Sequence, residues 1–265
     1  MKSIGKKICA VVAYSYTMAR RSDEAGVDVI LVGDSATRVF SGLSNHGFMN
    51  IEQMLYHTQA VSRACQHAWV MADFPQETIK AGVDIAVKDA KILIEEGKAD
   101  SVKVEDTSEN AIRIVEAVAK AGIPVVGHFS MMDVTDARVL SQPASSTEES
   151  LKKAMIAFGK RMESAGSCAL LLSKIDSTIA SEITQQVKIP AIGIGSGPGC
   201  DGQILVLEDL LGLTYRDHPY YVKQYAQLGQ SAMDAIGQYI SEIRSGAYPD
   251  KSHSKPTNKN NPKTE

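Results

Sequence analysis

The 265-residue chain has little cysteine, few aromatic residues and no large excess of charge of either sign. Its four cysteines form no C-x-x-C pair and no finger-like spacing, which argues against a redox motif and a structural zinc site. An aromatic content of 6% and a formal net charge of -3 argue against base-stacking platforms and a basic surface for nucleic acid. No apolar run approaches the roughly 18 residues of a membrane-spanning helix. We therefore expect no nucleic-acid or membrane partner, and cysteines kept reduced in the cytoplasm.

The first residues resemble a secretion signal, because Lys2, Lys6 and Lys7 precede a short apolar stretch. The sequence Tyr14-Ser15-Tyr16 interrupts that stretch, and Arg20-Arg21 follows it. We therefore interpret the stretch as the first strand of the fold.

Short apolar runs alternate along the chain with longer amphipathic patterns. Most of the runs are continuously apolar, as expected for strands buried on both faces of a parallel sheet. The predicted strands are Ile8–Ala13, Val29–Val32, Trp69–Ala72, Ser101–Val104, Pro124–Gly127, Ala169–Leu172 and Pro190–Ile194, with an eighth expected after Gly202. The predicted helices are Glu52–Ala64, Val83–Glu96, Asn110–Ala121, Glu148–Ala165 and Ile179–Gln186, followed by one or two helices in Tyr220–Ser245.

Alternating strands and helices with right-handed crossovers form either an open doubly wound sheet or a closed barrel. Seven or eight such units in a chain of 265 residues favour closure. We expect an α/β fold, a single (β/α)8 TIM barrel over residues 1–250 with the C-terminal helices included. Residues 251–265 are rich in Lys, Ser, Asn and Pro and lack an apolar pattern, so they are expected to be a disordered polar tail.

Acidic residues, Asp34, Asp73 and Glu105, follow three neighbouring predicted strands. The active site of such a barrel lies at the carboxyl ends of its strands, so these side chains should meet in one bowl. Three carboxylates repel one another unless a cation neutralises them, and oxygen ligands suit Mg²⁺. The alternative is that each acid caps the following helix. Their occurrence at successive strand ends favours a metal site.

Two basic residues lie in or directly after apolar strands. Lys103 could form a structural salt bridge with the acids or anchor a substrate carboxylate. His128 could donate to a substrate carbonyl or act as an acid–base group, although a lone histidine is more often a satisfied core residue. The run Gly193–Gly197 lacks the G-x-G-x-x-G spacing, so it predicts a tight turn or a close backbone approach to a ligand rather than a dinucleotide site.

Segments spread in order over roughly residues 8–250 resemble the ketopantoate hydroxymethyltransferase family, which acts first in pantothenate synthesis. They are Ala25–Ser35, Tyr56–Val61, Ala72–Pro75, Val102–Glu105, Pro124–His128, Ile189–Gly197, Asp201–Val206 and Arg244–Pro249. The resemblance implies a (β/α)8 barrel that is commonly a large homo-oligomer, often a decamer. It also implies Mg²⁺ and transfer of a hydroxymethyl group from methylenetetrahydrofolate to the keto acid 3-methyl-2-oxobutanoate.

The resemblance also assigns roles by position. The implied metal-binding residues are Asp34, Asp73 and Glu105; the implied substrate contacts are Asp34, Ser35, Asp73 and Lys103; and His128 is implied as a donor in the pocket. In such a site, Mg²⁺ chelated by the keto and carboxylate oxygens would acidify the adjacent carbon and stabilise the enolate.

The sequence departs from the family at the residue that removes the proton from the substrate. The family's general base, a glutamate at the end of the sixth strand, corresponds to Ser173. A neutral hydroxyl does not remove a carbon-bound proton unaided, so Lys174, Asp176 and a metal-bound hydroxide are the candidate replacements. The loop stretches Gly42–His46 and Ser130–Val134 also differ from the family pattern.

Three functional hypotheses follow. The chain is a ketopantoate-forming hydroxymethyltransferase with a relocated base, in which Ser173, Lys174 and His128 are the catalytic candidates. Alternatively, it is a related Mg²⁺-dependent aldolase or lyase that acts on another 2-keto acid. The third hypothesis is an inactive barrel with a binding or assembly role, against which the retained acids count, because buried carboxylates without a metal are costly.

Overall fold

The computed structural model describes residues 2–43, 49–130, 148–215 and 217–255. Eight parallel strands form a closed barrel, in which each strand pairs with the next and β8 pairs with β1. The strands are β1 (Ile8–Val12), β2 (Val29–Val32), β3 (Trp69–Asp73), β4 (Ser101–Glu105), β5 (Val125–Ser130), β6 (Ala169–Ser173), β7 (Ala191–Ile194) and β8 (Gly202–Val206). The predicted (β/α)8 barrel is therefore confirmed, and β8 is the strand expected after Gly202.

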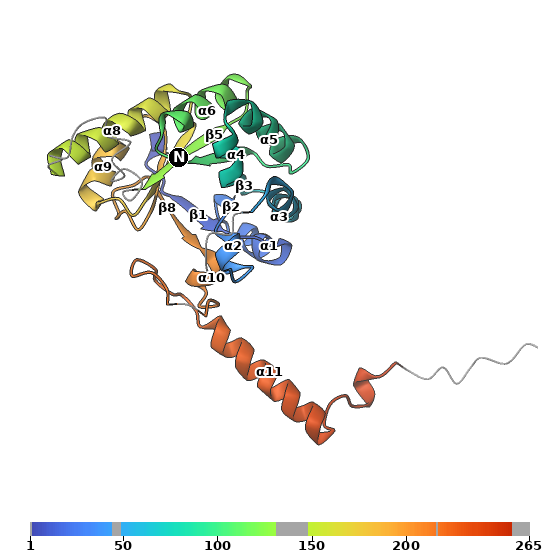
Figure 1. Ribbon diagram of the computed structural model, residues 1–265. Coiled ribbons are helices and arrows are strands. Elements are labelled where there is room, and N and C mark those ends of the chain that lie inside the picture. Colours follow the sequence, from blue (N-terminus) through green and yellow to red (C-terminus); the bar gives the residue numbers. More distant parts are fainter. Residues whose placement is uncertain (1, 44–48, 131–147, 216, 256–265) are drawn as a thin grey trace, which may run out of the picture.

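Helices form an outer layer around most of the barrel (Figure 1). In the described part of the chain they are α1 (Tyr16–Glu24), α2 (Ala36–Val39), α3 (Ile51–Ala64), α4 (Gln76–Ala81), α5 (Val83–Glu95), α6 (Glu109–Lys120), α8 (Glu148–Ser164), α9 (Ser177–Gln186), α10 (Leu207–Leu210) and α11 (Leu228–Ser245). The five helices predicted between Glu52 and Gln186 are confirmed to within two residues at each end. None of the described helices is long and apolar enough to cross a membrane.

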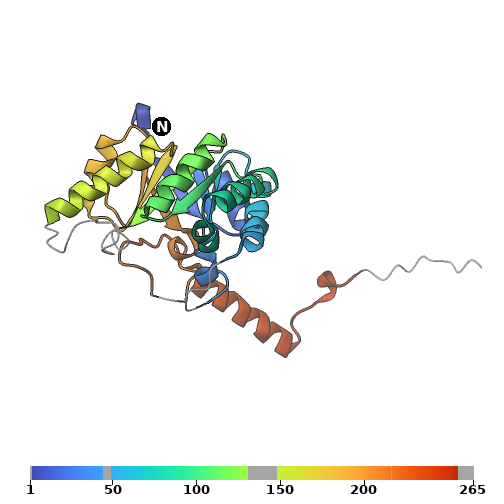
Figure 2. The ribbon, with the colours of Figure 1, turned by 45° about the horizontal axis from the view of Figure 1, so that its top comes forward.

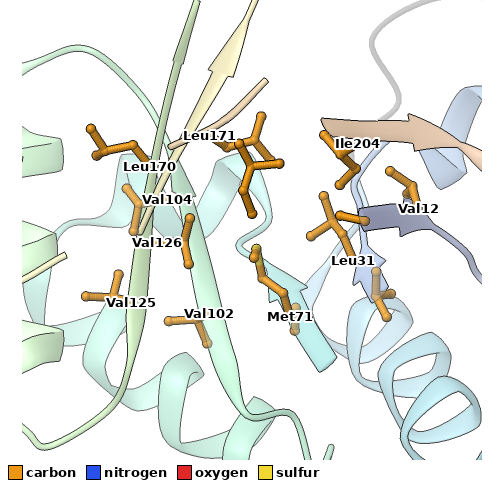
Figure 3. Close-up of a cluster of buried hydrophobic side chains, with 14 of the residues drawn as sticks. Val12, Leu31, Met71, Val102, Val104, Val125, Val126, Leu170, Leu171 and Ile204 are labelled. Carbon is orange, nitrogen blue, oxygen red and sulfur yellow. The ribbon is translucent and has the colours of Figure 1, made fainter. Parts of the chain in front are cut away.

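Successive residues of each strand face opposite sides of the barrel wall, which explains the continuous apolar runs. On β6, Leu171 lines the interior at the carboxyl ends of the strands, whereas its neighbour Leu170 packs outward against Gly159 of α8. Both leucines are buried. Figure 3 shows side chains from β1, β2, β3, β6 and β8 gathered in this core, among them Val12, Leu31 and Met71.

The outer layer is incomplete on the side of β7 and β8. Residues 195–201, which connect these strands, contain no helix, and α10 after β8 has only four residues. The long helix α11 stands away from the barrel, and none of its residues is buried (Figures 1 and 2). The chain therefore forms one helix, α11, where one or two were expected in Tyr220–Ser245, and it begins eight residues later.

The C-terminal region after α11 is described only in part. Lys251–His253 forms a single turn of 3-10 helix, capped by the Asp250 side chain. The rest of the expected disordered tail, residues 256–265, lies outside the described residues, as do parts of the two loop stretches that differ from the family pattern.

Candidate active site

A cavity of about 210 Å³ opens at the carboxyl ends of the strands. This volume is below the roughly 300–1,000 Å³ of pockets for drug-sized ligands, so it suits a small substrate. Its apolar lining includes Val12, Leu31, Leu171 and Ile204, which lie together in Figure 3. The polar and charged lining residues are Ser35, Arg38, Asp73, Lys103, Glu105, His128, Ser173, Lys174, Asp209 and Tyr221. Every site residue predicted from the sequence is in this set except Asp34 and the candidate base Asp176.

Strand register brings Asp73, Lys103, Glu105 and His128 into one cluster. The pairing of β3 with β4 sets Asp73 beside Lys103, and the pairing of β4 with β5 sets Glu105 beside His128. Lys103 Nζ lies 3.0 Å from Asp73 Oδ1, 2.9 Å from Glu105 Oε2 and 2.9 Å from His128 Nδ1. Glu105 and His128 lie within hydrogen-bond distance of the ammonium group, and Asp73 is its ion-pair partner. In this arrangement Lys103 takes the role of a structural salt bridge, one of the two roles considered for it.

The pKa values of the two acids in the cluster are shifted in opposite directions. Burial raises the pKa of Asp73 to about 7, although Lys103 opposes the shift. Burial also acts to raise the pKa of Glu105, but His128 and Lys103 outweigh it and hold that pKa well below its ordinary range. Desolvation acts to lower the pKa of Lys103, but Asp73 and Glu105 together raise it, so the ammonium form persists. Glu105 is therefore a carboxylate at neutral pH, and Asp73 is the acid of this cluster that holds a proton more readily.

Asp34 and Ser35 follow β2, next to this cluster. The Asp34 N–H donates to Asp73 Oδ2 over 3.1 Å, so the two acids are neighbours. Asp34 Oδ1 accepts from the Met49 N–H over 3.0 Å, and burial raises the pKa of Asp34. The hydroxyls of Ser35 and Tyr14 lie 2.8 Å apart, which fixes Ser35 at the cavity wall.

The same end of the cavity was predicted to bind a metal. Within the described ranges, no group of three or more His, Cys, Asp and Glu side chains is placed to hold one. The adjacent pair Asp34 and Asp73 is nevertheless suitable, because Mg²⁺ is commonly held by one or two carboxylates completed by substrate oxygens and water. Asp34, Asp73 and Glu105 carry three potential negative charges around the single ammonium of Lys103. A divalent cation would balance the remainder.

The end of β6 presents Ser173 and Lys174 to the cavity. Ser173 is half-buried and pairs with Ser130 across the β5–β6 ladder. Lys174 has a φ of 53°, which is uncommon for a residue with a side chain, and its N–H donates to the Ile194 carbonyl over 2.8 Å. Asp176, the other candidate base, accepts from two backbone N–H groups at the start of α9 and is not among the lining residues. Its described contacts are those of a helix cap.

Arg38 and Tyr221 line the cavity but were not identified from the sequence. Arg38 belongs to the four-residue helix α2, and Tyr221 comes from the irregular segment after α10. A Cβ at Gly195 would lie 2.8 Å from the Tyr221 ring, and Gly195 has a φ of +64°. The glycine run therefore does permit a close approach, but the group that approaches is Tyr221. An unexplained glycine after a strand is a signal that something packs there; it does not identify the partner.

Comparison with known proteins gives a consistent match. A family model described as ketopantoate hydroxymethyltransferase matches residues 1–251. A 3-methyl-2-oxobutanoate hydroxymethyltransferase from Prosthecochloris aestuarii is 39% identical over 253 residues, covering 94% of this chain and 91% of that protein. The enzyme of the same name from a Thermoanaerobacter species is 40% identical, covering 96% and 92%.

Solved structures of other enzymes share the fold at low identity. A structure of 2,3-dimethylmalate lyase aligns with a TM-score of 0.61 at 17% identity, covering 96% of this chain and 88% of that one. A complex of phosphonopyruvate hydrolase with oxalate and Mg²⁺ aligns with a TM-score of 0.62 at 13% identity, covering 97% and 89%. At such identities these structures support the barrel fold and not a shared reaction.

Proposed function

Because the chain belongs to the ketopantoate hydroxymethyltransferase family and is an enzyme of the hydroxymethyltransferase type, we propose that it transfers a hydroxymethyl group from methylenetetrahydrofolate to 3-methyl-2-oxobutanoate with the aid of Mg²⁺. The observation that carries this proposal is the pair Asp34 and Asp73 beside the Lys103 cluster, at the carboxyl ends of the strands. We also place the protein in the cytoplasm, in keeping with its four free cysteines.

Asp34 and Asp73 are the residues that would hold the metal, with Glu105 as the acid beside them. When bound, Mg²⁺ would polarise the keto group and stabilise the enolate. A protein with the same fold, phosphonopyruvate hydrolase, was solved with oxalate and Mg²⁺, and oxalate resembles the chelating end of a keto acid. Ser35, which is fixed by Tyr14, would contact the substrate carboxylate at this end.

His128 is suited to donate a hydrogen bond to the substrate's keto oxygen. Its Nδ1 lies 2.9 Å from Lys103 Nζ and 3.0 Å from Glu105 Oε2, so these two neighbours fix the ring through that nitrogen. Nε2 is the atom that would donate, and an N–H held in place there can stabilise an enolate oxygen as it forms.

Removal of the C3 proton is assigned to the end of β6, where Ser173 takes the place of the family's glutamate. Lys174 is the only candidate base with an amine among the described lining residues, apart from the fully engaged Lys103. Its amine would accept the proton, and the Ser173 hydroxyl beside it would orient the substrate.

Hydrogen–deuterium exchange at C3 of 3-methyl-2-oxobutanoate, followed by NMR with Mg²⁺, tests this assignment without folate. We expect exchange in the wild type, little in Lys174→Arg, which keeps the charge but cannot act as a base, and wild-type rates in the surface control Lys91→Met. A folded protein that supports no exchange contradicts the proposed reaction. Exchange in Lys174→Arg equal to the wild type would move the base elsewhere. Addition of methylenetetrahydrofolate then tests the transfer step directly.

Ser173 also favours a second candidate, a Mg²⁺-dependent lyase or aldolase that acts on a different 2-keto acid. In that case Ser173→Glu should create little activity toward 3-methyl-2-oxobutanoate, because the rest of the pocket suits another substrate. Strong ketopantoate formation after this single change would contradict the second candidate. The third hypothesis, an inactive barrel, is disfavoured by the cost of burying Asp73 with no catalytic use.

We propose in addition that the chain is a homo-oligomer, of the decameric kind that the family resemblance implies, in which α11 packs on a second copy. Its large hydrophobic residues, exposed by between 39% and 58%, are Leu228, Met233, Ile236, Tyr239, Ile240 and Ile243. The barrel flank at β7 and β8 lacks a long covering helix. Backbone bonds from Leu228 to Leu211 and from Gly229 to Gly212 fix the start of α11, which keeps it from folding back.

Light scattering coupled to gel filtration tests this assembly. The double change Met233→Glu and Ile236→Glu should lower the molar mass, because it charges the apolar face. The matched control Gln238→Glu adds charge elsewhere on α11 and should leave the mass unchanged. A wild-type protein that elutes as a monomer contradicts the proposal.

A further inference from the structure

Arg38 is a cavity-lining cation for which 3-methyl-2-oxobutanoate, the keto acid of the first proposed reaction, offers no partner. It is exposed, it lies in the last turn of the short helix α2 that follows β2, and none of the described residues forms an ion pair with it. Lys103, by contrast, lies within 3.0 Å of Asp73 and Glu105. The guanidinium of Arg38 is therefore available to an anion that enters the cavity.

The acids around the cavity do not oppose such an anion at its mouth. Asp73 is buried, and Glu105 is engaged by both Lys103 and His128. Asp209, the other lining acid, is 2% exposed and accepts a hydrogen bond from the Thr214 hydroxyl. Glu105 is the lining acid with substantial exposure, 40% of its side chain, but the Lys103 ammonium 2.9 Å away balances its charge. The other exposed charged groups that line the described mouth are the basic residues Arg38 and Lys174.

The end of β6 adds a third observation. Ser173 places a neutral hydroxyl on the cavity wall, so no carboxylate at that position repels a second negative charge. A branched-chain keto acid offers only methyl groups beyond C3, which leave an arginine without a partner. A guanidinium beside a small cavity is matched by a planar carboxylate or a phosphonate, with which it can form two parallel hydrogen bonds.

We infer that the preferred substrate is a 2-keto acid that carries a second anionic group, a carboxylate or a phosphonate, beyond C3, and that Arg38 binds this group. The inference rests on the second candidate function, an enzyme acting on a different 2-keto acid, and it takes the keto-acid end to be held at Asp34 and Asp73. Arg38 is then a specificity-determining residue. It acts on the distal end of the substrate and takes no part in proton removal.

Binding can be measured separately from turnover, by isothermal titration calorimetry with Mg²⁺. The ligands are 3-methyl-2-oxobutanoate, 2-oxoglutarate and 4-phosphono-2-oxobutanoate, which distinguish no second anion, a carboxylate and a phosphonate. We expect one of the dianionic acids to bind the wild type at least about tenfold more tightly than the monoanion, a typical effect of one charge-assisted hydrogen-bonded pair. Arg38→Met should abolish this preference, and Arg38→Lys should restore part of it.

A matched control is Arg113→Met, because Arg113 is an exposed arginine on α6 and is not among the cavity residues. Its preference should equal that of the wild type. Equal or weaker binding of both dianions to the wild type would overturn the inference, as would a preference that persists in Arg38→Met. C3 exchange then separates the two claims. Exchange of the monoanion with no Arg38-dependent preference removes the inference alone, whereas Arg38-dependent binding without exchange of any keto acid removes the reaction.

Discussion

Replacement of Lys103 by methionine should destabilise the barrel in a pH-dependent and metal-dependent way. The Lys103 side chain is 2% exposed, and its ammonium lies 3.0 Å from Asp73 and 2.9 Å from Glu105. Methionine has a similar length and fills most of the same space, so the change removes chiefly the charge. What remains is a fully enclosed acid at Asp73 and a partly exposed one at Glu105.

The expected loss can be bounded from the geometry. Attraction between unit charges 3.0 Å apart is about 5–6 kcal/mol at an effective dielectric constant of about 20. The ammonium's own desolvation offsets part of this, and the 40% exposure of Glu105 screens its share. Removing one partner of a buried ion pair costs about 3–5 kcal/mol in practice, and we expect a loss in free energy of unfolding within that range at pH 8.

The loss in free energy of unfolding should depend on pH, because Asp73 can take up a proton. The pKa of Asp73 is raised from its ordinary 3.8 to about 7, so the folded protein holds this proton more tightly than the unfolded chain does. Stability from this group therefore falls as the pH rises from about 4 to about 7. Without Lys103, the pKa of Asp73 should rise further and extend the fall to higher pH. The difference between the wild type and Lys103→Met should be small at pH 5.5 and largest at pH 8.

Urea unfolding at both pH values, followed by fluorescence of the single tryptophan and by circular dichroism, measures this difference. Mg²⁺ should restore part of the loss, since a divalent cation can take over neutralisation of the acids. Lys91→Met, on the exposed side of α5, is the control and should change stability by less than about 0.5 kcal/mol. A Lys103→Met protein as stable as the wild type, or a loss that is the same at both pH values, would refute this account of the cluster.

Further predictions concern the metal end and the glycine turn. Asp34→Ala and Asp73→Ala should each abolish a Mn²⁺ titration signal, and unchanged binding in both would exclude this pair as ligands. Mn²⁺ affinity should fall by about tenfold per pH unit below pH 7, because Asp73 must lose its proton before it binds, whereas a flat profile would argue against Asp73. Gly195→Ala should lower stability by about 1–3 kcal/mol, since its Cβ would lie 2.8 Å from Tyr221. The control Gly237→Ala, with no atom within 4 Å in the middle of α11, should be neutral or stabilising in thermal unfolding.

The barrel was predictable because its strands are buried on both faces and are therefore apolar without interruption. That pattern predicted β1 to β7 within a few residues, and only the short β8, with its exposed Gln203, was less distinct. The connection after β8 was not predictable in the same way. Its described residues between Leu211 and Gln227 form no regular element, and their path is set by tertiary contacts such as the hydrogen bond from the Tyr225 N–H to the Leu210 carbonyl.

The strand-end acids were also predictable, since in a parallel barrel position along the chain determines the end at which a side chain emerges. The side-chain direction of Asp34 was not predictable, because it depends on a hydrogen bond from the Met49 N–H, fifteen residues away. The sequence did not indicate Arg38 as a cavity residue either. An arginine six residues after a strand is ordinary in sequence, and only the folded chain places it at the cavity.

The two halves of the site differ in how easily they can change. The metal end is built on strand register, which pairs Asp73 with Lys103 and Glu105 with His128, so altering one member leaves a buried charge without its partner. Arg38 and Lys174 lie in segments after β2 and β6, where exposed side chains can be replaced without repacking the barrel. Substrate choice and proton removal can therefore diverge while keto-acid activation is kept. The family match over residues 1–251 is therefore compatible with a change of keto acid at these segments while the strand-end cluster is kept.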